Sequence, residues 1–348
     1  MKSARLLYLV TRVHGLMTHL LRPDEIQKLV NADSVQRLAE QLMATDYSSE
    51  GELQGVAEMS RPRLEKLRAS ELEEVFLRKM VSRLFFISSI SPVKVKEFVL
   101  AYSRRFEFEN IKRVIRAKHS GEKVEQLIPL TKEQTLVNFE ALLEAEDLAT
   151  VIKMLPERRY APSAESLNLY NEYNTTLVLE SQLDKIYYRA VLLAAKKLKD
   201  RDVIRLIGME IDVRNILTLL TMNVRKVKPE LVEHLIIPSG TLRGGRLVSM
   251  VQTGIGEIQS LLEGTPFARS VGGAVEAIGG EIEMYRVEAA LLAPFFERVK
   301  STVNKSLGIS YVMGYLIRSE IEAKNLIAIT MAKQLKLSVD ILQDIVLV

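Results

Sequence analysis

The chain has 348 residues, of which 47% are hydrophobic and 26% charged, and its formal net charge is +4. This composition is typical of a globular protein rather than a disordered chain. The absence of cysteine excludes a disulfide framework and any thiolate metal site, and it fits a reducing cytosol. Because the small basic excess is spread along the chain, we expect no nucleic-acid partner.

The opening residues, MKSARLLYLVTRVHG, begin with basic side chains, but Arg12 and His14 interrupt the apolar stretch that follows. We therefore expect no signal peptide. The longest apolar runs, such as LFFISSI at 84–90, are far shorter than the ~20 residues that span a bilayer. The sequence predicts no membrane-spanning segment.

Apolar residues recur three and four positions apart along almost the whole chain, whereas alternating runs typical of strands are hard to find. This pattern predicts an all-α protein. Several helix boundaries are marked as well: Ser91-Pro92 indicates a helix start, Gly121 follows a cationic helix end, and Ser338 opens a short terminal helix. Residues 163–199 contain neither proline nor glycine and predict one very long helix.

A short pattern occurs three times: a large apolar residue, an acid, two variable positions, an asparagine and an aliphatic residue. Its copies are FEFENI at 106–111, IDVRNI at 211–216 and IEAKNL at 321–326, so the asparagines are spaced 105 and 110 residues apart. Asparagine is a poor residue inside a helix because its side chain competes for backbone hydrogen bonds. Its recurrence therefore needs a structural reason.

A second marker keeps the same spacing. Each of the three segments is preceded by a short amphipathic helix that ends near an aromatic residue. These aromatic residues are Tyr47, Tyr160 and Phe267, spaced 113 and 107 residues apart. Because two independent markers recur at similar intervals, they predict a threefold internal duplication with a domain-sized unit. The predicted helical domains are residues 1–118, 119–228 and 229–348.

In each unit the acid lies three positions before the asparagine, which places both side chains on one helix face. One interpretation is a structural clamp, in which the pair satisfies backbone groups of a neighbouring loop or helix end. The alternative is that three copies face a common axis and meet a partner. We adopt the structural clamp for the pairs Glu107 and Asn110, Asp212 and Asn215, and Glu322 and Asn325.

The sequence contains no phosphate-binding loop, no HExxH motif, no calcium loop and no nucleophile elbow. The four histidines are also not spaced as metal ligands are; they are His14, His19, His119 and His234. We therefore expect no catalytic, cofactor-binding or metal-binding residue and no small-molecule substrate. Two alternatives stay open, an all-helical enzyme with a dispersed site and a helical scaffold or adaptor protein.

The quoted segments resemble a known family: the C subunits of archaeal and bacterial A/V-type rotary ATPases, whose eukaryotic counterpart is the d subunit of the vacuolar enzyme. The resemblance runs from ARLLYLVTRVHGLM at 4–17 to YLIRSEIEAKNLIAITMAKQLKLS at 315–338. The first unit departs from the other two, since it has Glu109 where they have Arg214 and Lys324. A basic residue before the asparagine is therefore not common to all three units.

The resemblance implies a closed funnel of three helical domains about a pseudo-threefold axis. It implies a non-catalytic part of the central stalk that couples the rotor shaft to the membrane proteolipid ring, for ion transport linked to ATP synthesis or hydrolysis. The implied partners are shaft subunits of the D and F type, held in the funnel socket, and the proteolipid ring. The implied location is peripheral, at the cytoplasmic face of the membrane, and no cofactor is implied.

Overall fold

A computed structural model describes residues 4–50, 67–124, 126–156, 160–224, 226–242, 247, 260, 262–271, 284–305 and 307–348. Within these residues every regular element is a helix and no strand occurs, which confirms the predicted all-α class. The helical spacing of the apolar residues is the physical cause, because it gives each helix one face to bury. None of the described helices is both long and apolar enough to cross a bilayer.

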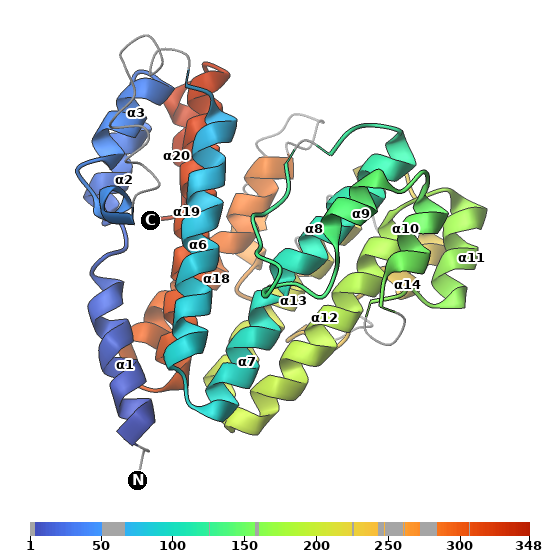
Figure 1. Cartoon of the computed structure of the whole chain (residues 1–348), viewed down its shortest axis with the longest axis horizontal. Coiled ribbons are helices and arrows are strands. Elements are labelled where there is room, and N and C mark those ends of the chain that lie inside the picture. The colour runs from blue at the N-terminus through green and yellow to red at the C-terminus, as the bar shows by residue number, and fades with distance from the viewer. Residues whose placement is uncertain are drawn as a thin grey trace. The chain divides into compact units, whose positions relative to one another are not determined.

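The chain forms two compact units (Figure 1). Unit 1 combines Met1–Pro92 with Leu292–Val348, and unit 2 is Val93–Leu291. The described elements of unit 1 are α1 (Ala4–Met17), α2 (Pro23–Val30), α3 (Val35–Leu42), η1 (Asp46–Glu50), α6 (Ala69–Ile90), α19 (Ile309–Gln334) and α20 (Val339–Ile345). Helix α18 (Met284–Lys305) crosses the boundary between the units. The three predicted domains, with boundaries at 118 and 228, stay a prediction.

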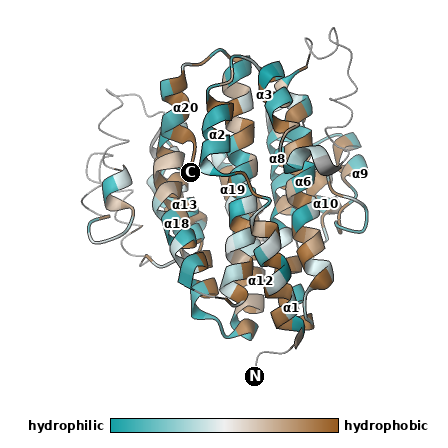
Figure 2. Ribbon diagram, turned by 90° about the vertical axis from the view of Figure 1, so that its left-hand side faces the viewer, coloured by the Kyte–Doolittle hydropathy of each residue, from teal (hydrophilic) through white to brown (hydrophobic). Residues whose placement is uncertain are grey.

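Helix α19 is the core helix of unit 1. It packs against α6 and α1, and all residues from Ser310 to Ile317 are buried. Its approach to α18 requires glycine at position 314, because a Cβ there would overlap the Val303 side chain. Figure 2 shows apolar and polar residues alternating along the long helices such as α6 and α19. This is the pattern of helices that bury one face.

Unit 2 is built around α12, which packs against α7, α8 and α13. Leu183, Tyr187 and Val191 lie four residues apart on α12 and are all buried, so they form one apolar stripe. The described elements of this unit are α7 (Val93–Ser103), α8 (Arg105–Ser120), α9 (Phe139–Glu144), α10 (Leu148–Met154), α11 (Ala164–Tyr173), α12 (Leu177–Leu198), α13 (Arg201–Val224), η2 (Pro229–Leu231) and α14 (Val232–Leu235).

The predicted helix boundaries are confirmed. Helix α7 begins directly after Ser91-Pro92, and Ser338 is the residue before α20. Gly121 ends α8 with a φ of 77°, and its N–H donates to the Ala117 carbonyl. Glycine suits this position because a Cβ disfavours the left-handed region.

The prediction of a single helix over 163–199 is wrong. Helix α11 ends at Tyr173, and α12 begins only at Leu177. Between them Asn174 adopts a φ of 47°, and its N–H donates to the Tyr170 carbonyl. Asparagine enters the left-handed region more readily than most residues, so a segment without proline or glycine can still be broken.

Two of the three predicted short helices are confirmed. The helix before Tyr47 is α3, with Ser34 as its cap, and the helix before Tyr160 is α10, capped by Asp147. Most of the third segment, 253–267, lies outside the described residues. Phe267 at its end is described and is fully buried.

Candidate functional site

Three buried asparagines occupy equivalent positions on α8, α13 and α19. Asn110 lies on α8, where its amide nitrogen donates to the Ile128 carbonyl at 2.9 Å. The Ile128 N–H in turn donates to the Asn110 carbonyl oxygen at 2.8 Å. The side-chain amide thus pairs with both backbone groups of one residue, as a neighbouring strand would do.

The other two asparagines make the same pair of hydrogen bonds. Asn215 binds both backbone groups of Ile237, at 2.9 and 2.8 Å, and Asn325 binds both backbone groups of Leu347, at 2.7 and 3.0 Å. The residue bound lies 18, 22 and 22 positions after its asparagine. These contacts give a buried amide its hydrogen-bond partners, which burial requires.

Sequence reasoning missed the three backbone partners, although two of them carry a signal. Ile128 and Ile237 each precede a proline. A residue before proline favours an extended conformation, which leaves its N–H and C=O free to point away from its own chain. An aliphatic residue followed by proline about 20 positions after such an asparagine would therefore have indicated the partner.

The acid of the first pair binds the segment that follows α8. One oxygen of Glu107 accepts from the Thr135 hydroxyl and from the N–H groups of Leu136 and Val137. The other oxygen accepts from the Tyr160 hydroxyl at 2.6 Å and from Arg104 at 3.1 Å. Both oxygens of this buried carboxylate are therefore saturated by donors.

The acid of the second pair has a smaller set of partners among the described residues. Asp212 accepts from the hydroxyl and the N–H of Thr241 and from the N–H of Leu242. Burial raises the pKa of Asp212, and the hydrogen bonds from Thr241 and Leu242 oppose that rise. The loop comes so close that a Cβ on Gly240 would overlap Oδ1 of Asp212. Glycine at 240 is therefore part of this contact.

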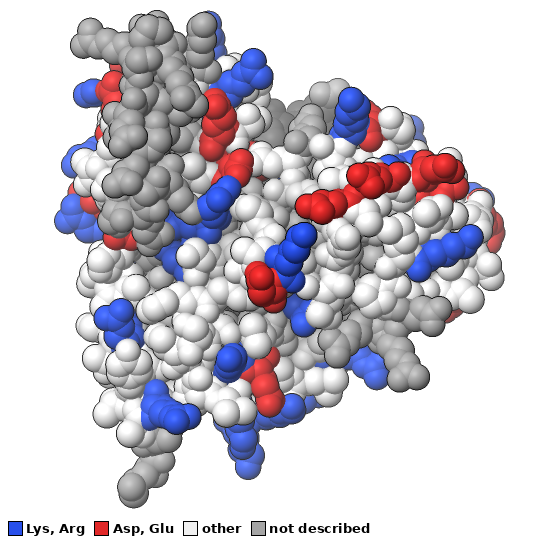
Figure 3. All heavy atoms as spheres, in the orientation of Figure 1, with Lys and Arg blue, Asp and Glu red and all other residues white. Residues whose placement is uncertain are grey.

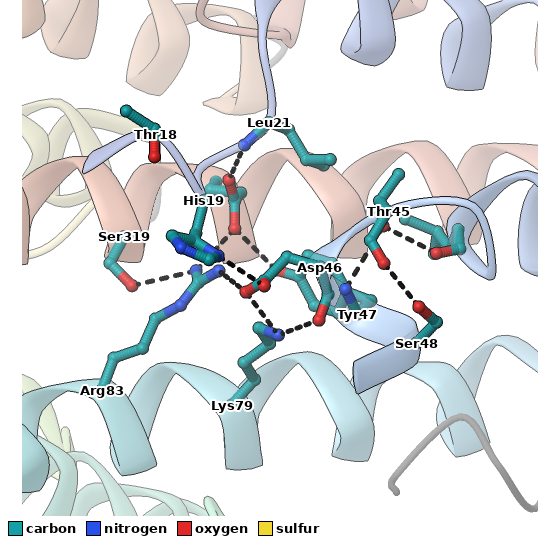
Figure 4. A network of polar contacts seen from close by, with 12 residues as sticks. Thr18, His19, Leu21, Thr45, Asp46, Tyr47, Ser48, Lys79, Arg83 and Ser319 are labelled. Carbon is teal, nitrogen blue, oxygen red and sulfur yellow. Dashed lines mark hydrogen bonds and ion pairs between the residues drawn. The ribbon is translucent and has the colours of Figure 1, made fainter. Parts of the chain in front are cut away.

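The acid of the third pair binds residues from the other end of the chain (Figure 4). Glu322 accepts from the Leu21 N–H at 2.5 Å, from the Tyr47 hydroxyl at 2.8 Å and from Arg83 at 2.6 Å. Residues 21 and 47 precede Glu322 by 301 and 275 positions. This contact therefore ties α19 to the segments that flank α2 and α3.

The local turns before Tyr47 and Phe267 are alike. The hydroxyl of Thr45 donates to the Leu42 carbonyl and accepts from the Tyr47 N–H. The hydroxyl of Thr265 makes the same two contacts, with the Leu262 carbonyl and the Phe267 N–H. Tyr47 and Phe267, 220 positions apart, thus follow turns of the same kind, although only Tyr47 carries a hydroxyl.

A charged network surrounds the third acid and was not predicted from the sequence. Asp46 lies 2.7 Å from Nδ1 of His19 and 3.1 Å from Nζ of Lys79, which is almost fully buried (Figure 4). Burial acts to raise the pKa of Asp46, but hydrogen bonds from His19 and Lys79 outweigh it and the pKa lies below its usual value. The network therefore holds the residues beside Tyr47 against α6.

The residue before the asparagine differs between the three copies of the pattern, and two of these residues, Glu109 and Arg214, both lie in the compact unit Val93–Leu291 and interact through their charges. Glu109 on α8 lies 3.0 Å from Lys112, which in turn lies 3.0 Å from Asp184 on α12. Burial alone would raise the pKa of Glu109, but the charges of Lys112, Arg116 and Arg214 lower it to about 2. The acid at 109 thus complements the arginine at 214 that occupies the corresponding position on α13.

These contacts connect parts of the chain to one another. Among the described residues no group of three or more histidine or acidic side chains is arranged to hold a metal ion. Each histidine lies beside a tyrosine or an acid of the same unit: His14 with Tyr311, His19 with Asp46, His119 with Tyr170, and His234 with Glu165. The polar groups at this site are suited to holding helices and loops in one register.

Comparison with known proteins gives matches along most of the chain. A family model described as ATP synthase (C/AC39) subunit matches residues 9–345. The C subunit of the A-type ATP synthase of Methanocaldococcus jannaschii is 25% identical, over 94% of this chain and 82% of that relative. The proteins of the same name from Pyrococcus abyssi and Archaeoglobus fulgidus are 27% and 26% identical, over 91% and 92% of this chain and 84% and 89% of theirs.

Proposed function

Because this chain belongs to the family of ATP synthase (C/AC39) subunits, as the sequence resemblance indicated, we propose that it is a non-catalytic collar in the central stalk of an A/V-type ATP synthase or ATPase. In this role it joins the rotor shaft to the membrane proteolipid ring so that the two rotate together. Ion transport is thereby coupled to ATP synthesis or hydrolysis. The family match over residues 9–345 is the observation that carries the proposal.

The proposed partners are the other moving parts of the machine. Shaft subunits of the D and F type occupy the socket of the collar, and the proteolipid ring lies beneath it. The protein is peripheral, on the cytoplasmic face of the membrane. Relatives that carry the name of the C subunit of an A-type ATP synthase support an assembly of this kind.

We further propose that the chain consists of three similar helical domains, residues 1–118, 119–228 and 229–348, arranged as a funnel about a pseudo-threefold axis. Three observations support the repetition: the recurring acid and asparagine, the identical two-bond contact of each asparagine, and the matching turns before Tyr47 and Phe267. The acids and asparagines act as structural clamps in this proposal.

A coupling part must resist deformation while it transmits torque. Each asparagine joins its helix to a segment 18 or 22 positions further along the chain, through two hydrogen bonds. Buried polar networks that are fully satisfied favour a single packing arrangement, and close-packed interiors are hardly compressible. The clamped helices are therefore suited to a stiff mechanical element.

The test compares the complete complex, the complex assembled without this protein, and the complex restored by adding it back. We expect ATP hydrolysis by the catalytic head to survive in all three, while ion pumping into vesicles is lost without the protein and returns with it. Undiminished pumping in its absence would refute the collar. Turnover of ATP by the isolated chain would favour an enzyme instead.

A further inference from the structure

The outer face of α1 is apolar and basic. The helix packs on α19 and α6 and buries Leu9, Val10 and Val13. On the opposite side Leu7 and Tyr8 are 62% and 55% exposed. A helix face that meets water is normally polar. The N-terminal half of α1 therefore presents a surface suited to a partner.

The charge of this region has one sign. The sequence contains no acidic residue before Asp24, while Arg5 and Arg12 of α1 are both exposed. In Figure 3 the surface over α1 shows basic and uncharged atoms without acidic ones. The neighbouring helix α6 continues this pattern, because it has no acid after Glu74.

The apolar surface extends from α1 onto α6. The guanidinium of Arg12 lies 5.9 Å from the ring centroid of Phe86, which is itself 39% exposed. Arg5 and Arg12 are seven residues apart, which is about two helical turns, and Leu7 and Tyr8 lie between them along the helix. With 3.6 residues per turn, Tyr8 lies beside the two arginines around the helix axis. Leu7 lies at the other edge of the exposed surface, so the cations and the aliphatic side chain flank this face.

We propose that this face of α1 binds the surface of an anionic phospholipid bilayer, with the helix lying in the plane of the interface. Charge complementarity selects the lipid, because arginine pairs with phosphate oxygens and basic helix faces are attracted to anionic headgroups. Leu7 enters the boundary of the acyl chains, and Tyr8 suits the headgroup level because its ring is apolar and its hydroxyl polar. An amphipathic helix of this kind lies on a membrane without crossing it.

The proposal goes beyond the collar function and does not depend on it, since it concerns the chain and lipid alone. The purified full-length chain is sedimented with vesicles of phosphatidylcholine, with or without phosphatidylglycerol. We expect sedimentation with the anionic vesicles only, weakening as salt is added. The Arg5→Gln/Arg12→Gln variant should bind about 25-fold more weakly, or about fivefold for each cation.

The matched control for charge is Arg37→Gln/Arg78→Gln, which removes two exposed arginines from the same unit outside α1. The matched control for apolar contact compares Leu7→Ser with Leu335→Ser, because both leucines are 62% exposed. We expect only the substitutions on α1 to weaken vesicle binding. All these residues are exposed, so the circular dichroism spectrum should be unchanged in every variant.

Insertion is measured by fluorescence, since the chain contains no tryptophan. The Tyr8→Trp variant should shift its emission to shorter wavelength with anionic vesicles, and the Leu335→Trp variant should not. Equal binding to both vesicle types, or binding that is unchanged in the α1 variants, would overturn the proposal. It would also be overturned if the chain sedimented with neither vesicle type. Loss of affinity for a protein partner in the α1 variants would then identify the face as a protein interface.

Discussion

The substitution Asn215→Leu removes both hydrogen bonds that the asparagine of one clamp makes, while it keeps a side chain of similar size on α13. Asn215 is fully buried and Ile237, its partner, is 3% exposed, so water has little access to either. The leucine leaves the N–H and C=O of Ile237 without their partner. Each such group costs about 1–3 kcal/mol when it is buried and unsatisfied.

Two effects offset part of this cost. Burying leucine in place of an amide is favourable, and the loop that carries Ile237 can shift toward water. We therefore expect the variant to lose about 1–3 kcal/mol of the free energy of unfolding, in line with measured hydrogen-bond deletions. The loss should be local to unit 2, in which both residues lie.

Urea denaturation followed by far-ultraviolet circular dichroism measures the overall change, and hydrogen exchange at the Ile237 amide measures the local one. A loss of about 2 kcal/mol corresponds to exchange that is about 30-fold faster. Asn168→Leu is the control, because Asn168 is an exposed residue on α11. If the Asn215 variant matches the wild type in both measurements, the clamp does not stabilise the fold and our reasoning about it fails.

Three further outcomes are expected. Gly240→Ala should lower the free energy of unfolding, measured by urea denaturation, by about 1–3 kcal/mol, because the new Cβ overlaps the Asp212 carboxylate. Tyr47→Phe should cost about 1.5–3 kcal/mol in the same assay, since it removes the buried hydroxyl that donates to Glu322. The pKa of Glu109 is about 2 against an ordinary 4.5, so the stability that this carboxylate contributes is complete above about pH 4.5 and is lost as pH falls toward 2. Glu109→Gln should therefore make the free energy of unfolding depend less on pH between these values.

Each of these substitutions has a matched control. Gly15→Ala places a Cβ where no atom lies within 4 Å, so it should not destabilise. Tyr173→Phe removes a hydroxyl from a residue that is only partly buried, and Glu144→Gln neutralises an exposed acid. Controls that behave like their test variants would show that the effects come from residue type and not from the clamps.

Local features of this fold could be predicted from the sequence, because they depend on residues a few positions apart. The helical class, the helix end at Gly121, the helix start after Ser338, and the shared face of each acid and asparagine all follow from 3.6-residue periodicity and the residue types preferred at helix ends. The break at Asn174 escaped prediction although it is also local. The cause is that asparagine tolerates the left-handed conformation without requiring it, so an asparagine in the sequence does not show whether the helix ends there.

The segments that the polar side chains bind could not be predicted in the same way. The regular spacing grouped Tyr47 with Glu107 in one predicted domain, yet the Tyr47 hydroxyl donates to Glu322, 275 positions later. Glu107 instead accepts from Tyr160, which lies 53 positions after it. Spacing in a sequence shows that a feature recurs. A hydrogen bond requires its two atoms to lie within about 3 Å of each other. The packing of the helices decides which acid meets which tyrosine at that distance. In unit 1 this packing brings together residues from both ends of the chain.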